Sequence, residues 1–160
     1  MRLDATDRQI LRILQADGRI ANSEIARRIG ISAPATHERV KKLEAAGVIE
    51  RYVALVNPST VGIRSHFFVE AKLTPHTKES VAEFIAATER VPEIMECHHV
   101  TGDADFLLRV SVRNIEAYED LVLHGLTDLP NVANLKTMVV LSTFKNDSAF
   151  PIEDEDDDHQ

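Results

Sequence analysis

The chain has little of what disulfide-bonded, membrane-spanning or secreted proteins need. Cys97 is its only cysteine, so no internal disulfide can form. No apolar run approaches the roughly 20 residues that cross a membrane. The opening stretch, MRLDATDRQI, has no apolar secretion segment. We therefore expect a cytoplasmic protein in a reducing compartment, without a membrane partner.

Positive charge is also scarce, and most of it lies at the front of the chain. The 160 residues carry a net charge of −8. Residues 1–56 hold ten Lys/Arg and seven Asp/Glu, whereas residues 57–160 hold eight and nineteen. Six of those acids form the run EDEDDD at 153–158, which we predict to be disordered because its charges repel and it can bury nothing. A basic front and an acidic back suggest two modules with different partners.

Helix signals follow one another quickly in the front module. Apolar residues recur there at helical spacing, and only GIS separates the second predicted helix from the third. Candidate caps and stops alternate along it: Asp4, Gly18, Asn22, Gly30, Ser32 and Gly47. Two helices joined by a tight turn in a small basic unit are typical of a helix-turn-helix DNA-binding motif. A strand over VIERYVALVN, residues 48–57, would form a wing.

The third helix has the pattern of a DNA-recognition helix. At about 100° per residue, Thr36, Val40 and Leu43 share one stripe, which we expect to be buried. The N-terminal half of such a helix enters the major groove, and nearby cations contact phosphates. An ordinary solvated face would also carry charges, but the helix lengths, caps and tight turn together favour DNA binding. The predicted DNA-binding residues are Arg27, Arg28, Ser32, Pro34, His37, Arg39, Lys41 and Lys42.

Residues 57–64 collect turn-forming residues and are interpreted as a linker. Beyond it the pattern runs strand, helix, strand, strand, helix, strand, which is the order of a ferredoxin-like fold with both helices on one face of an antiparallel sheet. The predicted fold class is α+β: a winged helix-turn-helix domain at 1–56, the linker, a ferredoxin-like βαββαβ domain at 65–146 and an acidic disordered tail at 147–160. Phe68, Met138 and Val140 would lie on the uncovered sheet face, where dimerisation would bury them.

In the second module, each predicted helix and strand has a group of side chains that we expect to point into the core. We expect one helix to bury Val81, Phe84, Ile85 and Thr88. In the other helix and the last strand the inward residues would be Ile115, Tyr118, Leu121, Val122, Leu126 and Leu129, followed by Leu135, Thr137, Val139 and Leu141.

The stretch CHHVTGDADFLLRV, residues 97–110, concentrates residues that carry chemistry. His98 and His99 are adjacent on a predicted strand and so point to opposite faces, which argues against a shared metal ion. Cys97 lacks a recognisable catalytic partner and is better interpreted as a small buried hydrophobe. What remains is a tight turn through Gly102, in which the side chains of Asp103 and Asp105 can accept hydrogen bonds from their own backbone. In such a loop, free backbone N–H groups suit the carboxylate of an amino acid, and side-chain carboxylates suit its ammonium group.

Several motifs resemble one family. LDxxDRxIL, DGRxxNxEIAxRxGxS, ERVKKLExxGVI and a strand ending in NP run almost without a gap from residue 3 to 58. They resemble the N-terminal half of the Lrp/AsnC, or feast/famine, transcriptional regulators. ECHHVTGDADFLLRV resembles the signature of that family's C-terminal effector-binding domain. The resemblance extends from residue 3 to about residue 145.

The resemblance implies a sequence-specific regulator without a cofactor or catalytic residues. Its partners would be double-stranded operator DNA and an amino acid effector, and it would form homodimers and higher multiples such as octamers. The effector would bind between dimers, at Thr101, Gly102, Asp103 and Asp105 and at the last-strand residues Thr137, Met138, Val139 and Val140.

Two alternatives remain open. Sirohaem decarboxylases resemble the same two-domain layout and use histidines of the C-terminal domain on a tetrapyrrole. Such an enzyme has little use for the basic helix that carries Arg39, Lys41 and Lys42, so we expect no enzymatic activity. A lone effector-binding module that has lost DNA binding is disfavoured by the intact first 56 residues.

Overall fold

The computed structural model describes residues 1–153, which form two units. Among these residues, the N-terminal unit contains Met1–Leu55 together with residues 145–153, and the C-terminal unit contains Val56–Phe144. The first and the last described residues therefore belong to the same unit. Within the described residues, no helix has the length and apolar character required to cross a membrane.

Three helices build the N-terminal unit, α1 (Ala5–Ala16), α2 (Asn22–Ile29) and α3 (Ala33–Ala45). Asp4 caps α1 as predicted, because its side chain accepts the Asp7 N–H at 2.8 Å and the Asp7 side chain accepts the Asp4 N–H at 3.2 Å. Ser32 caps α3 by accepting the Ala35 N–H at 3.3 Å. The predicted cap Asn22 is wrong by one position, since Ala21 is the N-cap of α2 and Asn22 is its first residue.

A small apolar core joins the three helices. Its buried apolar members are Ile10, Leu11, Ile25, Val40 and Leu43. The predicted stripe of α3 is confirmed, because Thr36, Val40 and Leu43 are the buried residues of that helix. The fully buried Thr36 hydroxyl donates to the Ser32 carbonyl at 3.1 Å, which satisfies it inside the core.

The strand predicted at 48–57 does not form in the single chain. A strand requires a neighbouring strand to satisfy its backbone N–H and C=O groups, and this segment pairs with none among residues 1–153. Several of its apolar side chains are exposed, among them Val53, Leu55 and Val56. A short 3₁₀ helix, η1 (Pro58–Val61), follows in the predicted linker.

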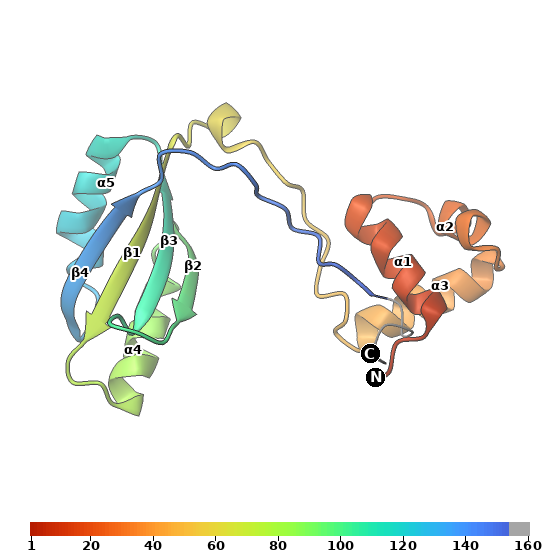
Figure 1. Ribbon diagram of the computed structural model, residues 1–160, viewed down its shortest axis with the longest axis horizontal. Helices are drawn as coiled ribbons and strands as arrows, with labels where there is room; N and C mark the ends of the chain where they lie inside the picture. The colour runs from red at the N-terminus through yellow and green to blue at the C-terminus, as the bar shows by residue number, and fades with distance from the viewer. Residues whose placement is uncertain (154–160) are drawn as a thin grey trace, which may run out of the picture. The chain divides into compact units, whose positions relative to one another are not determined.

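The C-terminal unit has the predicted ferredoxin-like order. Its elements are β1 (Ser65–Leu73), α4 (Lys78–Thr88), β2 (Ile94–His99), β3 (Phe106–Val112), α5 (Ile115–Leu121), a π-helical turn η2 (Val122–Leu126) and β4 (Val132–Val139). The antiparallel sheet has the strand order β2-β3-β1-β4, and both helices lie on one of its faces (Figure 1). The other face carries Phe68 directly opposite Met138 on the neighbouring strand.

The helix-covered face holds the larger core. Phe84 and Phe106 are fully buried with ring centroids 4.7 Å apart, and Phe67 stacks on Tyr118 at 3.8 Å. Two side chains predicted to point inward are instead exposed: Ile85 by 40% and Ile115 by 64%. Ile85 lies one position past Phe84, which turns it about 100° away from the packed side. Ile115 is the first residue of α5.

The end of the last strand also differs from the prediction. Val139 and Leu141, both expected to point inward, are 56% and 92% exposed. Of the same predicted set, Leu135 does pack against the core. The strand ends at Val139, so Leu141 lies beyond the ladder that would have held it.

The region predicted as an acidic tail, 147–160, is partly described. Residues 150–153 contact α1 through hydrogen bonds, and Ile152 packs against the N-terminal core. Residues 154–160 lie outside the described residues, so the prediction of disorder there stays a prediction.

Candidate DNA-binding surface and effector site

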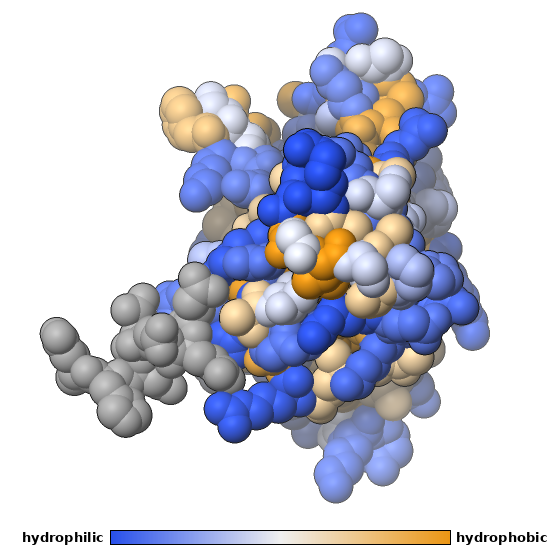
Figure 2. Space-filling model, turned by 90° about the vertical axis from the view of Figure 1, so that its right-hand side faces the viewer, coloured by the Kyte–Doolittle hydropathy of each residue, from blue (hydrophilic) through white to orange (hydrophobic). Residues whose placement is uncertain are grey.

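The exposed side of α3 carries most of the predicted DNA-binding residues. Ser32, Pro34 and His37 are exposed along its N-terminal half, opposite the buried Thr36. Lys41 and Lys42 are exposed further along the helix and form no ion pair with any residue between 1 and 153. Figure 2 looks at the N-terminal unit, and its near surface is mostly hydrophilic with small apolar areas between the charged groups. This face offers hydrogen-bonding groups and free ammonium groups to solvent.

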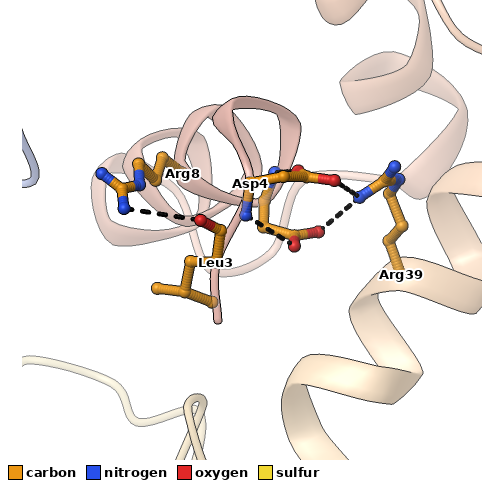
Figure 3. A network of polar contacts seen from close by, with 5 residues as sticks. Leu3, Asp4, Arg8 and Arg39 are labelled. Atoms are coloured by element: carbon orange, nitrogen blue, oxygen red, sulfur yellow. Dashed lines mark hydrogen bonds and ion pairs between the residues drawn. The ribbon is translucent and has the colours of Figure 1, made fainter. Parts of the chain in front are cut away.

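Arg39 lies on the same helix but has internal partners. Its Nη1 donates to Asp4 Oδ2 and to Asp7 Oδ1, each at 2.7 Å (Figure 3). The pair raises the pKa of Arg39, and the pKa of Asp4 is lowered first by its backbone bond from Asp7 and then by Arg39. Asp7 is nearly buried, with 9% of its side chain exposed. Arg39 therefore ties α3 to the start of α1, and the phosphate contact predicted for it stays a prediction.

The two predicted arginines of α2 share one carboxylate. Arg27 Nη2 lies 2.8 Å and Arg28 Nε 2.9 Å from Glu24 Oε1. The hydrogen bond from Arg27, followed by that from Arg28, lowers the pKa of Glu24 to about 2. These are exposed pairs within one helix, and such pairs contribute little to stability. Both guanidinium groups thus remain within reach of a phosphate at small energetic cost.

His37 connects the two helices of the motif. Its Nδ1 lies 3.1 Å from Nδ2 of Asn22, the first residue of α2, and this contact is exposed to solvent. Asn22 was predicted only as a helix cap, so its place beside His37 is an addition that the sequence did not indicate. The pair fixes the position of the imidazole on the exposed face.

An open cavity of about 490 Å³ lies on the uncovered face of the sheet in the C-terminal unit. Its walls come from β1, β4, the start of β3 and the loop after β2. The lining residues are Glu70, Ala71, Lys72, Val100, Thr101, Asp103, Ala104, Leu107, Asn134 and Lys136. Carboxylates and ammonium groups face the same space, and Lys136 Nζ lies 3.1 Å from Glu70 Oε2.

The predicted loop residues divide into two groups. Thr101 and Asp103 line the cavity, on either side of Gly102, whose φ of 125° favours glycine. Asp105 does not line it. Its Oδ2 accepts the Leu73 N–H at 2.8 Å and its Oδ1 lies 3.1 Å from His76 Nδ1, which together keep the pKa of Asp105 below its ordinary value. Asp105 therefore secures the end of the loop against β1.

The predicted residues of the last strand also divide. Thr137 points to the helix side, where its hydroxyl lies 2.6 Å from the Tyr118 hydroxyl. Met138 lies on the open face but outside the cavity lining, and neither Val139 nor Val140 lines it. Sequence reasoning missed Glu70, Lys72, Asn134 and Lys136. A signal existed, because Asn134 and Lys136 occupy the same strand face as Met138 at a spacing of two.

The cysteine and histidines of the 97–110 stretch have separate surroundings. Burial raises the pKa of the Cys97 thiol, which packs at the margin of the core. His98 lies beside Glu96 at 3.1 Å, whereas the ring of His99 stacks on Phe106 with centroids 4.9 Å apart. The prediction that the two histidines face opposite sides is confirmed. Among the described residues, no group of three or more His, Cys, Asp or Glu side chains is placed to hold a metal ion.

Family models match both units. A winged helix-turn-helix DNA-binding model matches residues 3–50, and the Lrp/AsnC ligand binding domain model matches residues 66–150. Together the two matches cover most of the chain. The first falls on α1–α3, and the second includes all four strands except Ser65 together with the residues that line the cavity.

Individual proteins agree with the family models. The leucine-responsive regulatory protein of Salmonella typhimurium is 40% identical over 150 residues, covering 94% of this chain and 92% of the relative. A transcriptional regulator from Neisseria meningitidis, solved in complex with L-Met, superposes with a TM-score of 0.88 at 31% identity over 94% of this chain and 97% of that one. An AsnC family transcriptional regulator from Agrobacterium tumefaciens gives a TM-score of 0.88 at 32% identity over 93% and 97% of the two chains.

The fold, the exposed face of α3 and these relationships lead to one conclusion. The chain belongs to the Lrp/AsnC family and is a DNA-binding transcriptional regulator that responds to an amino acid effector.

Proposed function

We propose that α3 reads operator DNA through Ser32, Pro34 and His37, while Arg27, Arg28, Lys41 and Lys42 contact phosphates. The observation that carries the proposal is the arrangement of α3, whose buried stripe leaves its N-terminal half open to a major groove. Arg39 acts indirectly, by holding α3 against α1.

The direct test is a gel shift on the DNA upstream of the protein's own gene, with a random duplex of equal length as competitor. The expected result is retention of the upstream fragment at protein concentrations that leave the random duplex free. Equal retention of both duplexes would contradict sequence-specific recognition.

We infer further that the effector is a free amino acid bound in the cavity beside Thr101 and Asp103. An amino acid presents an ammonium and a carboxylate, and the lining offers Glu70 and Asp103 for the first and Lys72 and Lys136 for the second. The relative from Neisseria meningitidis that was solved with L-Met supports an occupant of this class.

This assignment is tested by titrating each of the twenty amino acids against the gel shift and against the melting temperature. One amino acid is expected to change both, and Asp103→Asn is expected to abolish the response without weakening DNA binding. Glu119→Gln, an exposed acid on α5, is the matched control. A response that survives in Asp103→Asn would place the effector elsewhere.

We propose that the chain forms homodimers through its open sheet face and, beyond them, multiples such as octamers. Phe68 and Met138 give that face apolar character, and Met138 is 37% exposed in the single chain. The exposed apolar side chains of residues 53–56 supply a second surface for a partner copy. Sedimentation equilibrium of the wild type is expected to give at least a dimer. Met138→Lys should lower the mass, and an unchanged mass would exclude this face.

We propose that the protein works in the cytoplasm, where its DNA target lies, and that it is not an enzyme. His98 and His99 have separate partners on opposite sheet faces, which does not favour joint action on a tetrapyrrole. Purified protein is expected to lack tetrapyrrole absorbance. A stoichiometric tetrapyrrole together with loss of DNA retention would support the decarboxylase alternative.

A further inference from the structure

His37 of α3 has one ring nitrogen in contact with the protein and the other free for an external partner. Its Nδ1 lies 3.1 Å from Nδ2 of Asn22, the half-buried first residue of α2. Its Nε2, the ring nitrogen farther from the backbone, has no hydrogen-bond partner among residues 1–153. The exposed His37 therefore offers Nε2, and not Nδ1, to a DNA base.

The chemistry of the amide decides which nitrogen of His37 carries the proton. An amide NH2 group has two donor hydrogens and no lone pair to offer, so Asn22 Nδ2 can only donate. His37 Nδ1 must then accept. A neutral imidazole has a single N–H, and a nitrogen that accepts a hydrogen bond leaves that hydrogen on the other nitrogen. The contact with Asn22 thus keeps Nδ1 of His37 bare and the N–H on Nε2.

The two helices of the motif fix the place of this contact. Asn22 begins α2, whose Ile25 is fully buried in the core of the N-terminal unit. His37 directly follows Thr36 of α3, which is also fully buried. Because both helices are held by the same core, the amide and the imidazole are brought together although they lie 15 positions apart in sequence. The ring orientation is therefore set by the fold and not by His37 alone.

An N–H at Nε2 distinguishes between the bases of a duplex. In the major groove guanine presents two acceptors, N7 and O6, whereas cytosine presents only the donor N4 amino group. Adenine N7 and thymine O4 are acceptors as well. A histidine whose distal nitrogen donates can bond guanine and cannot bond cytosine. The other tautomer, with a bare Nε2, would have the opposite preference.

We propose that Asn22 determines part of the DNA specificity by holding His37 in the tautomer with the proton on Nε2, so that His37 recognises a hydrogen-bond acceptor on a base edge, foremost guanine. Asn22 is a positioning residue, since it acts through the imidazole. The proposal rests on the proposed function, in which His37 faces the major groove.

Two substitutions of Asn22 test this role in the full chain. Asn22→Asp keeps the size of the side chain but replaces the donor with a carboxylate, which accepts and so draws the proton of His37 to Nδ1. An acid in the first turn of a helix is favourable, so this variant is expected to fold. Asn22→Ala removes the contact and frees the ring. Ser23→Ala, at the next exposed position of α2, is the matched control.

Nitrogen NMR measures the tautomer in the absence of DNA. Long-range ¹H–¹⁵N spectra of ¹⁵N-histidine-labelled protein separate proton-bearing from bare ring nitrogens, and the signals that His37→Ala lacks belong to His37. The spectra are recorded at about pH 9, well above the ordinary pKa of histidine. Wild type and Ser23→Ala are expected to carry the proton on Nε2, and Asn22→Asp on Nδ1. A wild-type proton on Nδ1, or no change in Asn22→Asp, would overturn the proposal.

DNA binding shows whether the tautomer is read. Each base pair of the site in the upstream fragment is exchanged in turn, and affinities are measured by anisotropy at the same pH. The pair that wild type discriminates and His37→Ala does not is the one that His37 contacts. Wild type is expected to favour guanine over cytosine there by about tenfold. Asn22→Asp should lose this preference and keep those at the other pairs, Asn22→Ala should retain a smaller part of it, and Ser23→Ala should match the wild type.

Two binding results would also overturn the proposal. One is a wild-type preference for cytosine at the pair that His37 contacts. The other is an unchanged preference in Asn22→Asp when NMR shows the proton on Nδ1, because the tautomer would then not be read. Lack of discrimination at every base pair, in wild type and variants alike, would instead contradict the proposed function.

Discussion

The C-terminal unit buries twelve apolar side chains in one cluster, whereas the core of the N-terminal unit contains five. Polar contacts supplement the smaller core: the capping box of α1, the ion pairs of Arg39 with two carboxylates, and the hydrogen bonds from α1 to residues 150–153. Small domains bury a smaller fraction of their surface, so such ties carry more of their stability. The comparison predicts that core substitutions damage the C-terminal unit most, and that loss of the Arg39 ion pairs destabilises the N-terminal unit.

The largest effect is expected from Phe84→Ala. Phe84 is fully buried against Phe106, and removing such a ring costs about 3–5 kcal/mol of unfolding free energy. The neighbouring Ile85, 40% exposed on the same helix, is the control, and Ile85→Ala should cost less than about 1 kcal/mol. Urea denaturation measures both variants. Equal losses would contradict the assignment of the core face of α4.

A smaller effect is expected from Arg39→Ala. The substitution leaves the nearly buried Asp7 without its ion pair, which costs about 1–2 kcal/mol after allowance for the exposure of the pair. Lys41→Ala, two positions along the same helix, should leave stability within about 0.5 kcal/mol and weaken binding to every DNA sequence alike. Equal behaviour of the two variants in melting and anisotropy experiments would contradict the distinction between Arg39, which ties two helices together, and Lys41, which is proposed to contact phosphates.

Tyr118→Phe tests a side-chain hydrogen bond in the C-terminal unit, the unit with the larger apolar core. The change removes the 2.6 Å hydrogen bond to Thr137 but keeps the ring on Phe67, so the expected loss is about 1 kcal/mol. Thr137→Val, which removes the other partner, should cost a similar amount, and the double variant should cost less than the sum of the two. Additive losses in urea denaturation would show that the bond contributes nothing.

The smallest effect is a dependence on pH. The pKa of Asp4 is lowered in the folded state, first by the Asp7 backbone bond and then by Arg39. The stabilisation that the ionised Asp4 gives the folded state is therefore fully present above the ordinary pKa of aspartate. It is lost as the pH falls through the lowered pKa that Asp4 has in the folded state. Wild type should lose stability between neutral and acidic pH more steeply than Arg39→Ala, as thermal melts at several pH values can measure. Parallel curves would exclude the pair as a source of acid sensitivity.

Local patterns predicted most of the fold. Thr36, Val40 and Leu43 share a stripe that helix geometry alone identifies, and the Asp4 cap lies within three positions of its partner. The strand order of the C-terminal unit follows from alternation and turn residues in the same way. The prediction of a strand at 48–57 was wrong because a strand needs a neighbouring strand to pair with, and a local sequence pattern does not show whether one is present.

Contacts between residues far apart in sequence escaped prediction. Arg39 meets Asp4 and Asp7 across 35 and 32 positions, and Lys136 meets Glu70 across 66. Ion pairs of this kind leave no periodicity in the sequence, so a structural arginine and a DNA-binding one look the same. In the loop after β2, Asp103 lines the cavity whereas Asp105 accepts a hydrogen bond from Leu73 of β1, and no pattern in the sequence distinguishes the two aspartates.

The central claim is that the exposed N-terminal half of α3 reads sequence. It is tested most directly by the ratio of operator affinity to random-duplex affinity in His37→Ala, measured by anisotropy at fixed salt. A lost base contact costs about 1–3 kcal/mol, so the ratio is predicted to fall about tenfold while random-duplex affinity stays unchanged. A ratio equal to that of the wild type would contradict the account.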